Sequence, residues 1–235
     1  AGYAGVRADA TEQESWHRAN ALTPGQKTVL FAPTWNRDLS AAGLTRERTV
    51  ELLRGEREDI NVIIKPHPHT ARLRPDWHGA FRKAARDRAN VWFADDPAAD
   101  IVPFLRAADV LVSDVSSVIF SYLALDRPII LVTHPDRERD HGYDPQGIEW
   151  QWRDMGEEIF QIEDLPGAVA RALADPGQFA ARRAHYRQLL FGNLTDGRAA
   201  ERIAARIGAL GTGTEFNSVP STRGLSMGSD PIDRG

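Results

Sequence analysis

The stretch ADVLVSDVSSVIFSYLALDRPIIL, residues 108–131, contains the pattern that decides the fold. Its first apolar run, DVLVSD (109–114), predicts a buried strand, and SSVIFSYLALD after it predicts a helix. The next apolar run, RPIILVTH (127–134), predicts a second strand. Two buried strands joined through a helix are typical of a parallel sheet. The polar residues between the first strand and the helix are more than such a unit needs.

The same alternation continues along the chain in both directions. Short runs rich in β-branched or aromatic residues recur, with helical stretches between them. The six predicted strands are 28–35, 60–68, 90–95, 109–114, 127–134 and 157–162. Apolar runs without strict alternation, joined by crossover helices, indicate a sheet that is covered on both faces. We therefore expect an α/β fold with a Rossmann-like parallel sheet flanked by helices.

The two ends differ in composition from this middle part. Residues 1–26 mix small and charged residues without a strand pattern, and residues 211–235 are rich in glycine and serine. We expect an N-terminal connecting segment at 1–26, a Rossmann-like domain at 27–210 and a flexible tail at 211–235. The last ordered element is a helix predicted over 195–210, TDGRAAERIAARIGAL.

Composition excludes several classes of protein. The 235 residues include no cysteine, which rules out disulfides, thiolate catalysis and cysteine-bound metals. A net charge of −4 provides no broad basic surface for a nucleic acid. No apolar run approaches the roughly 20 residues that cross a bilayer, and the first residues lack the layout of a signal peptide. We expect a cytoplasmic protein that does not bind nucleic acid.

Candidate site residues follow the predicted strands, because parallel sheets bind ligands beyond the carboxyl ends of their strands. Four of the strands end in polar or conformationally restricted residues. These residues are Pro33, Thr34 and Trp35; Lys65 and His67; Ser113, Asp114, Ser116 and Ser117; and Thr133 and His134. We expect the four groups to converge on one rim of the sheet.

Ser116 and Ser117 fall at the first turn of the predicted helix that follows the fourth strand. Free backbone N–H groups and the positive end of the helix dipole favour an anion there. One N-cap residue would be enough for the helix itself. The surplus of polar residues predicts a phosphate site, and simple capping is the alternative.

Lys65 and His67 belong to the segment IIKPHP. A proline on each side of His67 stiffens the backbone and removes two amide donors, which fixes the direction of the imidazole. A histidine near neutral pH can give a proton or a hydrogen bond to a departing phosphate. The alternative is a histidine that only packs in a turn.

Four segments in series resemble the C-terminal, nucleotide-binding half of the CDP-glycerol glycerophosphotransferase family, which builds teichoic-acid-like polymers. The segments are APTWNRD, IIKPHP, ADVLVSDVSSVIFSYLALDRPII and NLTDGRAAERI. The resemblance spans about residues 28–207 and implies one lobe of a two-lobed GT-B fold. It also implies a CDP-glycerol donor, attack of an acceptor hydroxyl on the β-phosphorus, and release of CMP. Lipid-linked acceptors in the family imply contact with the inner face of the bacterial membrane.

The resemblance gives roles to the candidate residues. His67 matches the histidine of the family's K-x-H-P motif, which makes it the predicted catalytic residue. The segment 113–117 matches T-D-Y-S-S near the donor's phosphates, and 33–35 matches the A-P-T-W turn. Lys65, Thr133 and His134 complete the predicted substrate site.

The chain also departs from the family pattern. Val115 replaces a tyrosine, and Ser121 replaces an aspartate. The family's W-H-G-T-P segment, which carries another histidine, is missing, and we predict that WHGA (77–80) is a surface Trp–His pair. We therefore expect a donor-binding lobe that needs a separate N-terminal lobe or a partner chain for the acceptor.

Other chemistries have weaker support. The segments HPH (67–69), HPD (134–136) and RDHGYD (139–144) lack a recognised metal-ligand spacing, so we expect no metal. The absence of G-x-G-x-x-G disfavours NAD and FAD, and we expect no cofactor. Two alternatives stay open: a UDP-sugar glycosyltransferase or 2-epimerase on the same fold, and a noncatalytic module that binds a nucleotide or a partner.

Overall fold

A six-stranded parallel sheet forms the centre of the computed structural model, which describes residues 10–192 and 194–211. The strands are β1 (Lys27–Phe31), β2 (Ile60–Ile64), β3 (Val91–Phe93), β4 (Val110–Ser113), β5 (Ile129–Val132) and β6 (Glu157–Ile159). Their order is β3-β2-β1-β4-β5-β6, and every neighbouring pair is parallel. All six predicted strands are present, and the Rossmann-like fold class is confirmed.

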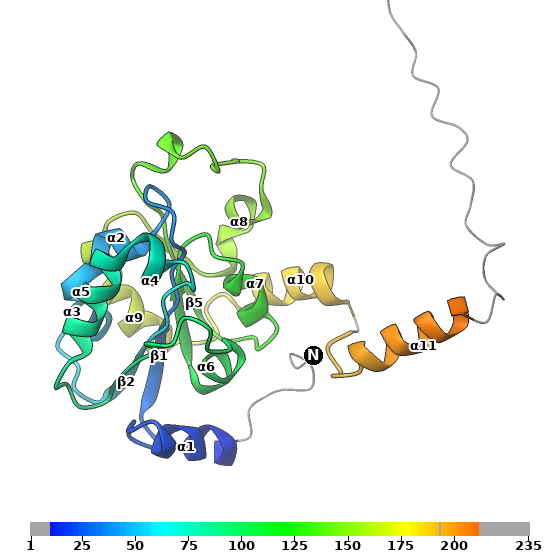
Figure 1. The fold of residues 1–235 in the computed structure, drawn as a ribbon, viewed down its shortest axis with the longest axis horizontal. Coiled ribbons are helices and arrows are strands. Elements are labelled where there is room, and N and C mark those ends of the chain that lie inside the picture. The colour runs from blue at the N-terminus through cyan, green and yellow to red at the C-terminus, as the bar shows by residue number, and fades with distance from the viewer. Residues whose placement is uncertain (1–9, 193, 212–235) are drawn as a thin grey trace, which may run out of the picture. The chain divides into compact units, whose positions relative to one another are not determined.

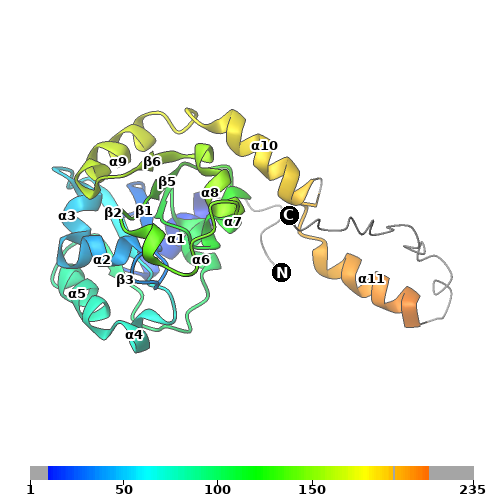
Figure 2. The same ribbon diagram turned by 90° about the horizontal axis from the view of Figure 1, so that it is seen from above.

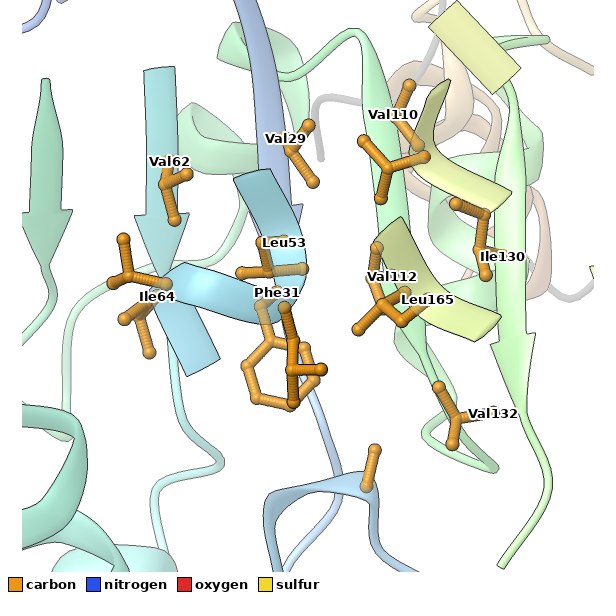
Figure 3. Close-up of a cluster of buried hydrophobic side chains, with 14 of the residues drawn as sticks. Val29, Phe31, Leu53, Val62, Ile64, Val110, Val112, Ile130, Val132 and Leu165 are labelled. Carbon is orange, nitrogen blue, oxygen red and sulfur yellow. The ribbon is translucent and has the colours of Figure 1, made fainter. Parts of the chain in front are cut away.

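The strands are apolar throughout because both faces of the sheet are covered. Val29 and Phe31 of β1 face one core cluster, whereas Leu30 between them faces the other. Figure 3 shows the first of these clusters, with Val62 and Ile64 of β2 beside the β1 side chains. This double burial explains why the sequence shows continuous apolar runs instead of strict alternation.

Helices cover the two faces in separate groups (Figures 1 and 2). The first cluster packs against α2 (Ala41–Thr45), α3 (Thr49–Arg54), α5 (Pro75–Ala85) and α9 (Leu165–Ala174). The second cluster packs against α1 (Ala10–Ala19), α6 (Val102–Ala107), α7 (Val118–Leu123) and α10 (Ala180–Phe191). The shorter elements are η1 (Arg46–Arg48), α4 (Thr70–Leu73), η2 (Arg137–Arg139), α8 (Ile148–Gln151), η3 (Arg153–Met155) and η4 (Ile162–Asp164).

Helix α1 lies inside the segment 1–26, for which we expected a connection. His17 is buried, and its Nε2 lies 3.3 Å from the carbonyl oxygen of Ala107. The Trp16 ring packs edge-on against Trp92 and Phe104, with centroid separations of 5.9 and 5.6 Å. Helix α1 is therefore packed onto the domain, which begins before the predicted start at residue 27.

The chain divides into two compact units, residues 1–197 and 198–235. In the described part of the second unit, α11 spans Ala199–Gly211. The predicted last helix is therefore present, but it begins at Ala199 and not at the predicted residue 195. Apart from Gly211, the predicted flexible tail at 211–235 lies outside the described residues. Within the described residues, no helix combines the length and the apolar character that crossing a membrane requires.

Candidate functional site

The site lies where the order of the strands reverses. Strands β1 and β4 are neighbours at the middle of the sheet, with β2 and β3 on one side and β5 and β6 on the other. The loops that leave β1 and β4 lead to helices on opposite faces of the sheet, α2 and α7. Such a reversal leaves a crevice at the carboxyl edge, which is the usual ligand site of a doubly wound sheet.

Asp114 ties these two loops together. The residue is fully buried, and its carboxylate accepts hydrogen bonds from the backbone N–H groups of Thr34 and Ala41, both at 2.9 Å. It also accepts from the N–H groups of Val115 (2.7 Å) and Ser116 (3.2 Å). Burial raises the pKa of Asp114, and the bonds from these N–H groups oppose that rise. Because each of these partners is a donor, the arrangement suits the ionised carboxylate.

Ser113 and Thr34 belong to the same framework. The Ser113 hydroxyl is buried and donates to the carbonyl oxygen of Ala32 at 2.7 Å. The carbonyl oxygen of Thr34 accepts from the Ser40 hydroxyl at 2.8 Å. Ser113, Asp114 and Thr34 were all predicted to bind substrate, and the structure places them beneath the rim with polar groups that already have protein partners.

A first cavity of about 330 Å³ opens above this framework. Its predicted lining residues are Pro33, Lys65, His67, Ser116 and Ser117. Loops from β1, β2 and β4 contribute them, so three of the four predicted strand ends do converge. The volume falls in the range of small-molecule sites.

Lys65 is a buried cation in the wall of the first cavity. Only 3% of the residue is exposed, and its Nζ donates to the carbonyl oxygen of Pro66 at 3.3 Å. No carboxylate within the described residues forms an ion pair with it. Burial lowers the pKa of Lys65, and the charge of Asp96 opposes this. A buried charge that no carboxylate contacts directly is costly, so an anionic ligand would stabilise it.

His67 has one of its two ring nitrogens occupied by the backbone. Its Nδ1 accepts from the N–H of His69 at 3.1 Å, which places the proton of the neutral ring on Nε2. Burial lowers the pKa of His67, and the charges of His69 and Lys65 lower it further. Near neutral pH the residue is therefore neutral and donates a hydrogen bond through Nε2–H. Two roles were predicted for His67, and this geometry favours hydrogen bonding over proton donation.

Trp35 supports the histidine loop from the side. Its ring centroid lies 6.3 Å from that of His67 and 5.4 Å from that of His69. The residue is half-buried and does not line the first cavity. Of the A-P-T-W turn, Ala32 and Pro33 line the cavity, whereas Trp35 packs against the rings of His67 and His69.

Ser116 and Ser117 contrast with the buried pair that precedes them. Ser117 is the N-cap residue of α7, yet its side chain makes no capping hydrogen bond. Within the described residues, neither serine hydroxyl bonds to another protein group. Because α7 has only six residues, an anion here would depend on the hydroxyls and local N–H groups more than on a helix dipole.

Thr133 and His134 do not join the first cavity. Thr133 is buried and donates its hydroxyl hydrogen to Glu158. His134 lines a second cavity of about 420 Å³, on the other side of the loop that follows β1. The structure thus divides the predicted rim into two cavities, because β5 is separated from β1 by β4.

Arg153, which was not predicted from the sequence, bonds to the loop that follows β4. It is 5% exposed, its Nε lies 2.5 Å from Glu158 Oε1, and its Nη1 donates to the carbonyl oxygen of Asp114 at 3.1 Å. Burial lowers the pKa of Arg153, and the carboxylate of Glu158 opposes this. No local pattern distinguishes this arginine from the many surface arginines of the chain.

The prediction of a surface Trp–His pair at 77–80 is wrong. Trp77 and His78 are 4% and 9% exposed, because α5 turns them toward the first core cluster and β3. A Cβ atom at Gly43 would lie 3.0 Å from the Trp77 ring, so this position of α2 leaves little room for a side chain. Trp77 also contributes to the second cavity.

No cluster of three or more potential metal ligands occurs within the described residues.

The structure is a Rossmann-like domain in which a cavity with a buried lysine in its wall lies where the strand order reverses. Residues 6–209 match the family described as CDP-Glycerol:Poly(glycerophosphate) glycerophosphotransferase. The chain therefore belongs to this family. No curated protein matches the chain in sequence.

Solved structures share the fold at low sequence identity. The wall teichoic acid polymerase TagF gives a TM-score of 0.65 at 17% identity, covering 86% of this chain and 47% of that one. A glycosyltransferase from Rickettsia africae ESF-5 gives 0.53 at 11% identity, covering 85% and 52%. An alpha,alpha-trehalose-phosphate synthase (UDP-forming) from Burkholderia vietnamiensis gives 0.50 at 14% identity, covering 88% and 51%. The chain thus spans about half the length of these proteins.

Proposed function

We propose that this chain is the donor-binding lobe of a glycerophosphotransferase and that its first cavity binds the diphosphate of CDP-glycerol or a related CDP-alditol. The observation that carries the proposal is Lys65, a buried cation without a carboxylate partner among the described residues. The His67 Nε2–H and the hydroxyls of Ser116 and Ser117 surround the same space. Membership of the family supports the class of donor.

In the proposed reaction, an acceptor hydroxyl attacks the β-phosphorus of the donor. A new bond forms between the acceptor oxygen and that phosphorus, the bond to the bridging oxygen breaks, and CMP leaves with the electron pair. Lys65 stabilises the negative charge that develops on the diphosphate, and His67 donates a hydrogen bond to it. Ser116 and Ser117 orient the phosphates for attack.

The acceptor hydroxyl must also lose its proton. His67 is poorly placed for this, since its free nitrogen carries a hydrogen in the neutral ring. We assign the base that accepts this proton to a separate N-terminal lobe or partner chain, because TagF contains about as much chain again. A cytoplasmic location, with contact at the inner membrane face, follows from a lipid-linked acceptor and belongs to the same proposal.

A UDP-sugar enzyme is the second candidate, and one residue favours it. Ser121 lines the first cavity at the position where the resemblance leads us to expect an aspartate. A hydroxyl in place of a carboxylate changes the charge next to the group that the nucleotide carries. The replacement affects which donor, a CDP-alditol or a UDP-sugar, fits the first cavity. The proposed contacts to the diphosphate are the same for both donors.

Calorimetric titration of the full chain with CDP-glycerol, CDP, UDP and UDP-N-acetylglucosamine separates the candidates. We expect cytidine nucleotides to bind more tightly, and His67→Ala to weaken CDP-glycerol by about tenfold, the equivalent of one charge-assisted hydrogen bond. His185→Ala, an exposed histidine on α10, serves as the matched control. Preference for uridine nucleotides would support the second candidate, and no binding of any nucleotide would refute both.

A further inference from the structure

The second cavity lies at the same edge of the sheet as the first, over the opposite face. Its walls come from Arg37 and Asp38 in the loop after β1, from the α2, η1 and α5 side, and from the loop after β5. The first cavity instead borders α7, which packs on the other core cluster. The loop after β1, fixed by Asp114, contributes to both cavities.

His134 in the second cavity repeats the local geometry of His67 in the first. Each histidine precedes a proline after a parallel strand, and each accepts the backbone N–H two residues later through Nδ1 at 3.1 Å. Strands β2 and β5, which carry these loops, flank the central pair β1 and β4. His134 is 7% exposed, and its neutral ring offers only Nε2–H to the cavity. The loops thus present two imidazole donors on opposite sides of the switch point.

The second cavity has more cationic than anionic side chains in its wall: three arginines (Arg37, Arg46 and Arg139) and two aspartates (Asp38 and Asp136). Burial lowers the pKa of His134, and the charges of these two aspartates oppose this. Arg139 pairs with Asp136 at 2.8 Å, and Arg46 lies 4.0 Å from Asp76. Arg37 makes no hydrogen bond or ion pair with any described residue, although it lines the cavity. A guanidinium without a partner and an oriented imidazole N–H match the oxygens of a phosphate group.

We infer that the second cavity binds a phosphate group of the acceptor, a chain of polyol phosphates, through Arg37 and His134. The anion site follows from the geometry of the cavity, whereas its assignment to the acceptor rests on the proposed function. In this arrangement the donor diphosphate and an acceptor phosphate occupy opposite sides of the β1 loop. The buried Trp77 ring, in the wall beside them, offers an apolar surface to the carbon atoms of the polyol.

Calorimetry on the full chain tests this assignment with a synthetic glycerol phosphate oligomer and with inorganic phosphate. Combining Arg37→Gln with His134→Gln should raise the Kd for the oligomer by about tenfold. The same variant should leave the Kd for CDP-glycerol within about twofold. The matched control combines Arg86→Gln with Arg88→Gln, two exposed arginines between α5 and β3 at the opposite edge of the sheet. Arg37→Gln alone keeps the test valid if the histidine variant fails to fold, since Arg37 is exposed.

Two results would overturn the inference. One is oligomer binding that the control pair weakens as much as Arg37→Gln does, which would indicate attraction to arginines in general. The other is inorganic phosphate binding as tightly as the oligomer, which would remove the acceptor assignment. Failure of the proposed function would look different: CDP-glycerol would not bind, while oligomer binding would still depend on Arg37.

Discussion

Two pairs of polar residues in one five-residue stretch have opposite uses. Ser113 and Asp114 are fully buried, and their side chains bond to the backbone of the β1 loop and its neighbours. Ser116 and Ser117 are partly exposed, line the first cavity and leave their hydroxyls without partners among the described residues. Strand β4 ends at Ser113, and Val115 separates the two pairs.

This difference shows that one sequence motif can fix the loops around a site and also provide groups that contact the ligand. A buried carboxylate that satisfies several N–H groups fixes the relative positions of two loops. Hydroxyls that the fold does not use remain available to a ligand. Lys65 resembles Ser116 and Ser117 in serving the ligand and not the fold. Its buried charge has a desolvation cost, and it adds little to the stability of the protein.

Asp114→Ala should have the largest effect, a loss of stability. A small loss would contradict the division between a structural pair and a ligand-binding pair. The change leaves the N–H groups of Thr34, Ala41 and Val115 buried without their acceptor. We expect a loss of roughly 3 kcal/mol or more in the free energy of unfolding, measured in urea. Ser116→Ala, the control from the other pair, should stay within about 0.5 kcal/mol of the parent. Equal losses in both variants would mean that the stretch has a single role.

Lys65→Met should separate binding from stability. Removing the buried charge should weaken CDP-glycerol by roughly tenfold to a hundredfold, because a charged contact to the diphosphate is lost. The free energy of unfolding should rise by about 1 kcal/mol, since methionine fills the space without a desolvation cost. Lys83→Met, an exposed lysine on α5, is the matched control and should change neither quantity. A Lys65→Met protein that unfolds more easily would show that the lysine stabilises the fold.

Ser116→Ala combined with Ser117→Ala should produce a smaller change in affinity. One hydroxyl of the pair donates a hydrogen bond to a phosphate oxygen, so we expect a loss of roughly fivefold to tenfold for CDP-glycerol. Isothermal titration at matched ionic strength measures it, with unfolding in urea as the check on the fold. Unchanged affinity would place the diphosphate away from α7.

The smallest expected effect is on the dependence of stability on pH. Burial lowers the pKa of His17 from its ordinary value of 6.5, and its hydrogen bond to the Ala107 carbonyl opposes this. The unfolded chain then takes up the proton first as the pH falls, so this stabilisation is complete above pH 6.5 and is lost below it. Urea unfolding at a series of pH values should show a shallower decline for His17→Gln. An unchanged slope would contradict the burial of this imidazole.

Much of the fold could be predicted because its strands are buried on both faces. The apolar runs gave all six strands, but the first was predicted to continue to residue 35, beyond the observed end at Phe31. The reason is local: Pro33 has no N–H, and the N–H of Thr34 bonds to Asp114 instead of to a strand. Such a side-chain partner cannot be inferred from periodicity.

The division of the site into two cavities depends on strand order, which a single sequence does not reveal. Runs at 60–68 and 127–134 both predicted loops at the carboxyl edge, and both loops are there. Their histidines line different cavities because β2 and β5 lie on opposite sides of the central pair. The burial of Trp77 likewise depends on how α5 rotates against α2, and no pattern in WHGA reports that rotation.

A crystal structure of the chain with CDP-glycerol bound would show directly whether the first cavity holds the diphosphate. We expect diphosphate oxygens at hydrogen-bond distance, roughly 2.7–3.2 Å, from Lys65 Nζ, the His67 Nε2 and a hydroxyl of Ser116 or Ser117. Lys65 should then exchange its contact with the Pro66 carbonyl for the ligand. A diphosphate bound in the second cavity, with Lys65 still on the Pro66 carbonyl, would contradict it.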